Sequence, residues 1–216
     1  MTRREELQLA LKTVEDEIAS YSPTLIVVTK TYPLSDVQIL QELGVVNFGE
    51  NRDEEGVVKS IVDATWHYQG ALQSQKIRSI VGWADVIHSL DQNKHGEKIN
   101  RIAAELEKNI EVFLQLSLDG DPSRGGVVLE KLLALAENAQ KWEAVKLAGM
   151  MCVPPVEWEA ERAFTEIEES HAVFVEKFPH STALSAGMSG DYLVALAHGA
   201  THIRVGSKIL GHRTHR

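Results

Sequence analysis

The 216-residue sequence has a single cysteine and no long apolar run. Because Cys152 has no second cysteine to pair with, an intramolecular disulfide is excluded, which fits a reducing compartment. No apolar run reaches the roughly 18 residues that a membrane helix needs. Residues 1–6 are mostly charged or polar and lack the apolar segment of a signal peptide. We therefore expect a cytoplasmic protein that does not enter a membrane.

The sequence also lacks an excess of basic charge. It has 22 Lys and Arg against 31 Asp and Glu, which gives a formal net charge of -9. Binding to nucleic acid through release of counterions requires the opposite balance, so we expect no nucleic-acid partner. Hydrophobic residues make up 44% and charged residues 25%, which is typical of a globular protein long enough for one large domain.

One apolar stretch, residues 25–30, organises the rest of the chain. It reads LIVVTK, a pattern typical of a strand buried on both faces, and it ends at Lys30. In parallel α/β folds the carboxyl ends of the strands form the mouth where ligands bind. We therefore expect the amine of Lys30 at a binding site, where burial would favour its neutral, nucleophilic form. The alternative is a lysine that only extends from the barrel rim into water.

Strand and helix patterns alternate along the whole chain. After an amphipathic helix over residues 3–20, strands are predicted at residues 25–30, 45–48, 66–69, 86–90, 112–118, 145–151, 183–188 and 202–205, with helical patterns between them. Eight such units predict a single-domain (β/α)8 TIM barrel over residues 1–216 with an extra N-terminal helix. The alternative is a doubly wound open sheet, although no G-x-G-x-x-G fingerprint follows the first strand.

Two turns near the C-terminus have the composition of an anion site. Ser189 follows the seventh predicted strand, and Gly206 and Ser207 follow the eighth. In barrels these loops often hold a phosphate through backbone N–H groups, to which the serines would add hydroxyl donors. The alternative is that the serines and the glycine only cap two helices.

Arg204 lies two residues before Gly206 on the eighth predicted strand, so its side chain should point toward the same mouth. A guanidinium stays protonated and could donate to an unprotonated pyridine nitrogen. A lysine, a phosphate-binding turn and this arginine together predict a pyridoxal 5'-phosphate (PLP) site. The alternative is an ion pair between Arg204 and a rim carboxylate such as Asp191 or Glu50.

The chain also resembles the pyridoxal phosphate homeostasis protein family, single-barrel relatives of the alanine racemase N-terminal domain. The resemblance is carried by VVTK, NFGEN, WHYQGALQSQK, VIHSLD, LAGMMCVPP, LSAGMSGDYLVALAHGATHIRVG and SKILG. It implies a Schiff base between PLP and Lys30, and Arg204 facing the pyridine nitrogen. It implies phosphate contacts at Ser189, Gly206 and Ser207, and a pocket lined by Asn51, His88, Ser185 and Met188. Departures at Ala71, Gln75, Arg124 and Leu210 concern the entrance of the pocket.

The resemblance favours a PLP carrier that buffers or delivers the cofactor, with PLP and apo PLP-dependent enzymes as candidate partners. A racemase needs acid/base groups on both faces of the substrate, and beyond Lys30 the chain offers only Tyr32 and Tyr192. We therefore expect no catalytic residues, while an amino-acid racemase and a cofactor-free Schiff-base aldolase remain alternatives. The histidine spacing predicts no metal site. We expect a monomer, because the apolar stripe of the first helix can be buried against the barrel.

Overall fold

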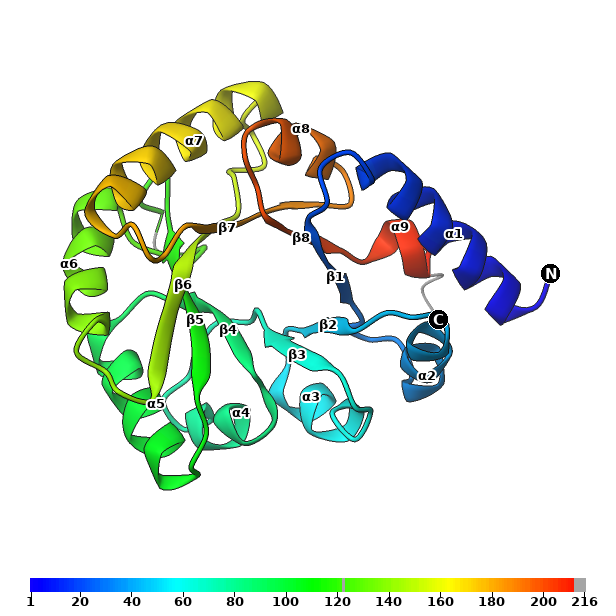
Figure 1. Ribbon diagram of the computed structural model, residues 1–216, viewed down its shortest axis with the longest axis horizontal. Coiled ribbons are helices and arrows are strands. Elements are labelled where there is room, and N and C mark those ends of the chain that lie inside the picture. The colour runs from blue at the N-terminus through cyan, green and yellow to red at the C-terminus, as the bar shows by residue number, and fades with distance from the viewer. Residues whose placement is uncertain (122, 212–216) are drawn as a thin grey trace.

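A closed barrel of eight parallel strands forms the centre of the molecule (Figure 1). The computed structural model describes residues 1–121 and 123–211. Neighbouring strands in the sequence pair with each other, and β8 closes the barrel by pairing with β1. The strands are β1 (Thr24–Val28), β2 (Asn47–Glu50), β3 (Thr65–Tyr68), β4 (Val86–Leu90), β5 (Ile110–Leu116), β6 (Val145–Cys152), β7 (Ala183–Met188) and β8 (His202–Val205).

Helices surround the barrel and connect successive strands (Figure 1). They are α1 (Arg3–Ile18), α2 (Leu34–Glu42), α3 (Asp53–Lys59), α4 (Ile77–Trp83), α5 (Asn93–Glu105), α6 (Leu129–Ala139), α7 (Ala160–Lys177), α8 (Tyr192–Ala197) and α9 (Ser207–Leu210). The prediction of a TIM barrel with an extra N-terminal helix is confirmed. The open-sheet alternative is wrong, because the pairing of β1 with β8 leaves no sheet edge. No helix within residues 1–121 and 123–211 is long and apolar enough to cross a bilayer.

Helix α1 lies on the outside of the barrel, beside α9 (Figure 1). It begins at a capping box, in which the Thr2 hydroxyl accepts from the backbone N–H of Glu5 and the Glu5 carboxylate accepts from that of Thr2. Its apolar stripe is buried, as the spacing predicts. Arg3 donates to Asp36 and to the carbonyl of Leu210. Helix α1 is therefore tied directly to the last turn of α9, next to the mouth of the barrel.

The second strand differs from the prediction, which placed it at residues 45–48. It spans Asn47–Glu50, because Gly44 has a φ of +99° and the N–H of Val45 still bonds to the carbonyl of Leu40 at the end of α2. The strand therefore starts two residues later than its apolar letters suggest. As a result Glu50 is the last residue of a strand and is fully buried.

Candidate functional site

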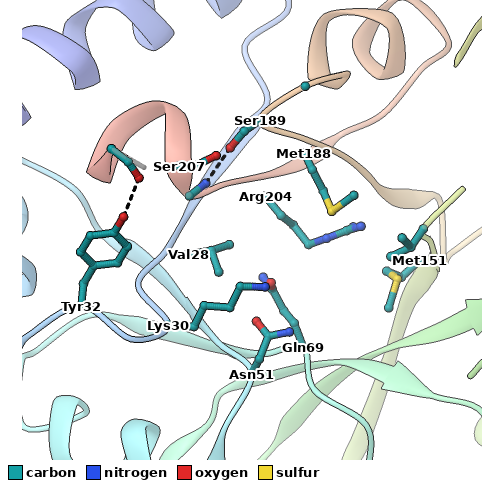
Figure 2. A pocket seen from close by; sticks show the side chains of 14 residues that line it. Val28, Lys30, Tyr32, Asn51, Gln69, Met151, Met188, Ser189, Arg204 and Ser207 are labelled. Atoms are coloured by element: carbon teal, nitrogen blue, oxygen red, sulfur yellow. Dashed lines mark hydrogen bonds between the residues drawn. The ribbon is translucent and has the colours of Figure 1, made fainter. Parts of the chain in front are cut away.

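A cavity of about 440 Å³ opens where the carboxyl ends of the strands meet (Figure 2). Seven of the nine residues predicted for the site line it: Lys30, Asn51, Met188, Ser189, Arg204, Gly206 and Ser207. They follow or end β1, β2, β7 and β8, so segments far apart in the sequence converge here. The barrel therefore places a lysine, an arginine and two serine-containing turns around one cavity of small-molecule size.

Lys30 comes two residues after the end of β1, and its side chain extends into the cavity (Figure 2). The residues that precede it, from Ile26 to Thr29, are buried, whereas Lys30 itself is exposed. The expectation of a buried amine at a binding site is thus corrected in part, because Lys30 is exposed. The lysine projects from a buried strand into an open mouth, where a ligand can reach it.

Two side-chain amides near Lys30 have buried polar atoms without a partner. Oδ1 of Asn51 and Nε2 of Gln69 are both buried and make no hydrogen bond in the part of the chain that the structure describes. Both residues line the cavity. Because leaving such groups unpaired is costly, they fit a site that is completed by a polar ligand. Gln69 was not predicted for the site, although it directly follows β3 as Asn51 directly follows β2.

The turns after β7 and β8 are joined by one hydroxyl. Oγ of Ser189 accepts from the backbone N–H of Gly206 at 3.1 Å (Figure 2) and also from that of Lys208 at 3.4 Å. Ser189 therefore orients the N–H groups at the start of α9 and does not cap its own helix, since α8 has no side-chain cap. A β-carbon at Gly206 would lie 3.1 Å from the carbonyl oxygen of Val28, so glycine lets this turn pack closely on β1.

Arg204 is 5% exposed, and its guanidinium lines the cavity. Nη1 donates to Oγ of Ser185 at 2.7 Å, and Nη2 donates to the carbonyl of Cys152 at 3.0 Å. Burial lowers the pKa of Arg204 to about 10, which still leaves it protonated at neutral pH. Within the described residues Arg204 forms no ion pair, and Glu50 instead pairs with Lys59. The alternative, an ion pair between Arg204 and Asp191 or Glu50, is therefore absent from the described residues.

His88 and Ser185, the other two predicted site residues, do not line the cavity but lie beneath Arg204. Both are fully buried. Nδ1 of His88 is 2.9 Å from Oγ of Ser185, which accepts from Arg204. Neither is among the residues that line the cavity, so their contact with a ligand stays a prediction. In this structure the two residues support the arginine through the Ser185 hydroxyl.

A row of buried hydrogen bonds extends from Arg204 down the barrel interior. Beyond His88, its Nε2 is 2.9 Å from Nδ1 of His67, whose Nε2 is 3.0 Å from Oδ1 of Asn47. Arginine can only donate and a carbonyl oxygen can only accept, so with both histidines neutral each group donates to the next along the row. Ser185 donates to His88, His88 to His67, and His67 to Asn47. Both neutral histidines then carry their proton on Nε2.

Burial of the two histidines agrees with this assignment. It lowers the pKa of His67 to about 3, and the charge of His202 acts in the same direction. Burial also lowers the pKa of His88 well below its usual value, with further contributions from His67 and Arg204. Because Ser185 donates its proton to His88, its Oγ can accept from Arg204. This bond holds the guanidinium at the base of the cavity.

The departures noted in the sequence lie outside the cavity. Ala71, Gln75, Arg124 and Leu210 are not among the residues that line it. Arg124 donates from Nη1 to the carbonyl of Pro154 at 3.1 Å and from Nη2 to that of Val153 at 3.2 Å. Since Val153 does line the cavity, Arg124 holds part of the rim through the backbone.

These features define a (β/α)8 barrel that presents a lysine, a buried arginine and two linked serine-containing turns to one small cavity. The chain matches the family model of the alanine racemase N-terminal domain over residues 5–214. It is 42% identical over 201 residues to the pyridoxal phosphate homeostasis protein of Corynebacterium glutamicum, covering 89% of this chain and 91% of the relative. It is 34% identical to that of Mycobacterium leprae, covering 97% and 93%. The chain therefore belongs to the pyridoxal phosphate homeostasis proteins within the alanine racemase N-terminal domain family.

Solved structures agree with this assignment. PipY of Synechococcus elongatus, solved with PLP bound, superposes with a TM-score of 0.88 at 31% identity, covering 95% of this chain and 100% of that one. An alanine racemase of Clostridium difficile superposes with a TM-score of 0.80 at 14% identity, covering 98% of this chain and 60% of the racemase. The second likeness concerns the fold alone.

Proposed function

We propose that this protein binds PLP, holds it as a Schiff base on Lys30 and takes part in intracellular PLP homeostasis. The observation that carries the proposal is the convergence of Lys30, Arg204 and the Ser189–Gly206 turn on one cavity. The relatives named pyridoxal phosphate homeostasis proteins and the PLP-bound PipY support it. PLP supplies an aldehyde that an amine can attack, a phosphate and a pyridine nitrogen, and the chain offers a group suited to each.

The residues around the cavity divide these tasks. The amine of Lys30 would condense with the aldehyde and release one water molecule. Ser189, Ser207 and the backbone at Gly206 would hold the phosphate, because N–H and hydroxyl donors at the start of a helix favour an anion. The phosphate would take over the N–H of Gly206, which donates to Ser189 in this structure. Arg204 would donate to the pyridine nitrogen and keep it unprotonated. Asn51 and Gln69 would give their unpartnered amide atoms to polar groups of the ring.

The test is the absorption spectrum of purified protein after addition of PLP. We expect a Schiff-base band that is lost in Lys30→Ala and retained in Lys76→Ala, whose lysine is paired with Glu54 on the surface. Borohydride reduction and mass spectrometry should place a pyridoxyl phosphate group on Lys30. An unchanged spectrum in Lys30→Ala would reject the assignment, and a trapped sugar phosphate would favour the aldolase.

Amino-acid racemisation is a second candidate, because Tyr32 lines the same cavity as Lys30. Its hydroxyl, however, donates to the carbonyl of Gly211 at 2.5 Å (Figure 2). The Tyr192 hydroxyl bonds to Glu17 on α1. Neither tyrosine is placed as a free second acid/base group, so we propose a carrier without robust catalysis and without catalytic residues. Incorporation of solvent deuterium at the α-carbon of a panel of amino acids would contradict this.

We further propose that the protein acts in the cytoplasm as a monomer and passes PLP to apo PLP-dependent enzymes. An exposed lysine in an open mouth suits release as well as capture. Light scattering should give the mass of one chain. Transfer should appear as recovered activity of an apo enzyme that is mixed with loaded protein in the presence of a trap for free PLP, and no recovery above the trap control would argue against direct delivery.

A further inference from the structure

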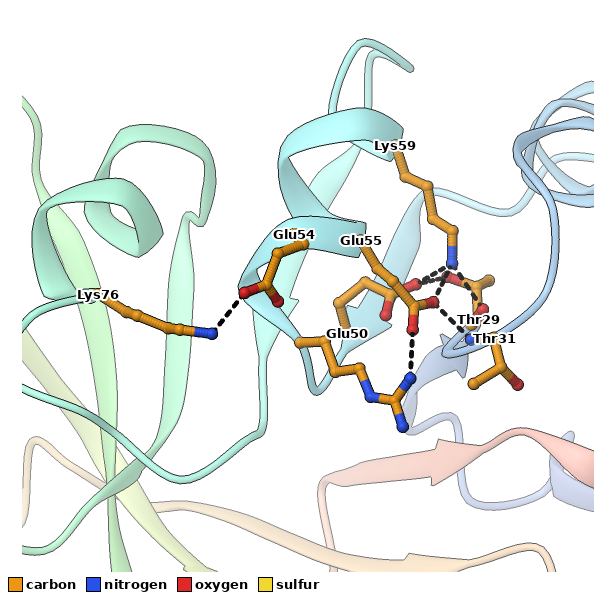
Figure 3. A network of polar contacts seen from close by, with 8 residues as sticks. Thr29, Thr31, Glu50, Glu54, Glu55, Lys59 and Lys76 are labelled. Carbon is orange, nitrogen blue, oxygen red and sulfur yellow. Dashed lines mark hydrogen bonds and ion pairs between the residues drawn. The ribbon is translucent and has the colours of Figure 1, made fainter.

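A buried lysine contacts the segment that follows β1 and carries Lys30. Lys59, the last residue of α3, is 4% exposed. Its amine donates to the carbonyl of Thr29 at 2.8 Å, to Oε1 of Glu50 at 2.6 Å and to Oε2 of Glu55 at 2.9 Å (Figure 3). All three donors of the ammonium are thus used within this cluster, which we call the Lys59 cluster.

The Lys59 cluster contacts the backbone on both sides of Lys30. Before it, the carbonyl of Thr29 accepts from Lys59 and the Thr29 hydroxyl donates to Glu50 at 2.6 Å. After it, the N–H of Thr31 donates to Oε2 of Glu55 at 2.5 Å (Figure 3). The peptide groups that determine where the Lys30 side chain starts are therefore held by charged groups from β2 and α3.

Thr31 has an unusual backbone conformation that such a contact can maintain. Its φ is +69°, which is rare for a β-branched residue because Cβ crowds the backbone there. A residue in this region persists only when its surroundings fix it, and such residues cluster at functional sites. The charge-assisted bond from Thr31 to Glu55 is one such restraint.

Stability alone gives a weak reason for the Lys59 cluster. Two buried charges lose their hydration, and an ion pair repays that loss only when the remaining hydrogen bonds are satisfied. Here Oε2 of Glu50 is buried without a hydrogen-bond partner among the described residues. Burial raises the pKa of Glu50, although the bonds from Lys59 and Thr29 act in the opposite direction. An apolar cluster of the same size could fill this space, but it could not hold the backbone around Lys30.

We propose that Lys59, together with Glu50 and Glu55, is a positioning group for Lys30: it fixes the peptide groups on either side of that lysine and so directs its amine toward the aldehyde of PLP. This inference rests on the proposed function, because it assigns a purpose to the placement of the Lys30 amine. It concerns the formation of the Schiff base between Lys30 and PLP. The phosphate would be bound by the turns after β7 and β8.

The test separates covalent attachment from binding of the rest of the cofactor. Lys59→Met is combined with Glu50→Gln, so that no buried carboxylate is left without its cation. The matched control is Lys76→Met, which removes the surface pair of Lys76 with Glu54 near the same helix (Figure 3). For each protein we would measure the rate of Schiff-base formation with PLP and the dissociation constant of pyridoxine 5'-phosphate, which has the phosphate and ring but no aldehyde.

We expect the Lys59→Met/Glu50→Gln protein to form the Schiff base roughly 10- to 100-fold more slowly, the scale of loss that follows from misplacing a reacting group by about 1 Å. Its affinity for pyridoxine 5'-phosphate should stay within about twofold of the wild type, and Lys76→Met should be unchanged in both assays. A normal rate of Schiff-base formation would overturn the inference. An equal loss in both assays would also overturn it, because it would indicate general damage to the site.

A second pair of variants keeps the test valid if the double variant does not fold. Glu55 is partly exposed, with 20% of its side chain accessible, so its replacement disturbs the interior less. Glu55→Gln retains an acceptor for the N–H of Thr31, whereas Glu55→Ala removes it. Slow Schiff-base formation in Glu55→Ala and recovery in Glu55→Gln support the inference, and equal rates in the two contradict it. If the wild type itself gives no band that depends on Lys30, the proposed function fails instead.

Discussion

The two buried histidines of the barrel interior, His67 and His88, make the free energy of unfolding depend on pH in a defined direction. In the folded protein, burial lowers the pKa of His67 to about 3 and that of His88 well below its usual value. In the unfolded chain each histidine titrates near 6.5. Below that pH the unfolded state binds protons that the folded state does not, so acid favours unfolding. The free energy of unfolding is therefore highest above about pH 6.5, and it decreases as the pH falls toward the pKa of the folded state.

The magnitude follows from the proton linkage. At pH 5 an unfolded histidine of pKa 6.5 is almost fully protonated, and each buried histidine that stays neutral costs about 2 kcal/mol of stability. The pair therefore costs about 4 kcal/mol at pH 5 relative to pH 7 or above. Against a total stability of about 5–15 kcal/mol this is a large effect. It should appear as a marked fall in the urea midpoint between pH 7 and pH 5.

The assay compares wild type with the variant His67→Gln/His88→Gln, because glutamine can also donate and accept within the row but cannot be protonated. Urea unfolding at several pH values between 5 and 8 should show that the wild type loses about 4 kcal/mol more than the variant over this range. His180→Gln, which replaces an exposed histidine, serves as the control and should follow the wild type. Parallel pH curves for the wild type and the double variant would refute the assignment of both histidines as neutral.

Three further predictions concern single positions. Gly187→Ala should lower the free energy of unfolding by about 2 kcal/mol or more in urea denaturation. The reason is that φ of Gly187 is +93° and the new β-carbon would lie 2.7 Å from that of Ala195. An unchanged urea midpoint would contradict this. Gln69→Leu should weaken PLP binding several-fold in a fluorescence titration, since it removes an unpartnered amide, and unaltered affinity would remove Gln69 from the site. Hydrogen bonds to Glu161 and Glu168 raise the pKa of His198. The free energy of unfolding of the wild type should therefore slightly exceed that of His198→Gln below pH 6.5, and the difference should vanish as the pH rises through the raised pKa. A difference that grows with pH would contradict this.

The order of the elements and much of the site could be predicted from the sequence, because both depend on local patterns. Alternating buried strands and amphipathic helices predict a barrel, and polar residues that follow the strands predict its mouth. Lys30, Arg204 and the Ser189 turn lie in the cavity as their positions along the strands imply. The residue motifs identified the family, which the relatives then confirmed.

Other features depend on contacts between distant segments, which no local pattern contains. The sequence does not show that Arg204 rests on Ser185 and His88, or that Lys59 and Glu55 hold the backbone beside Lys30. Such contacts join residues that strand pairing brings together across the closed barrel, and whether a side chain faces the cavity or lies beneath it is determined by packing in three dimensions. The sequence by itself determined which chemical groups reach the mouth of the barrel. Only the tertiary structure decided which of them line the cavity and which hold the others in place.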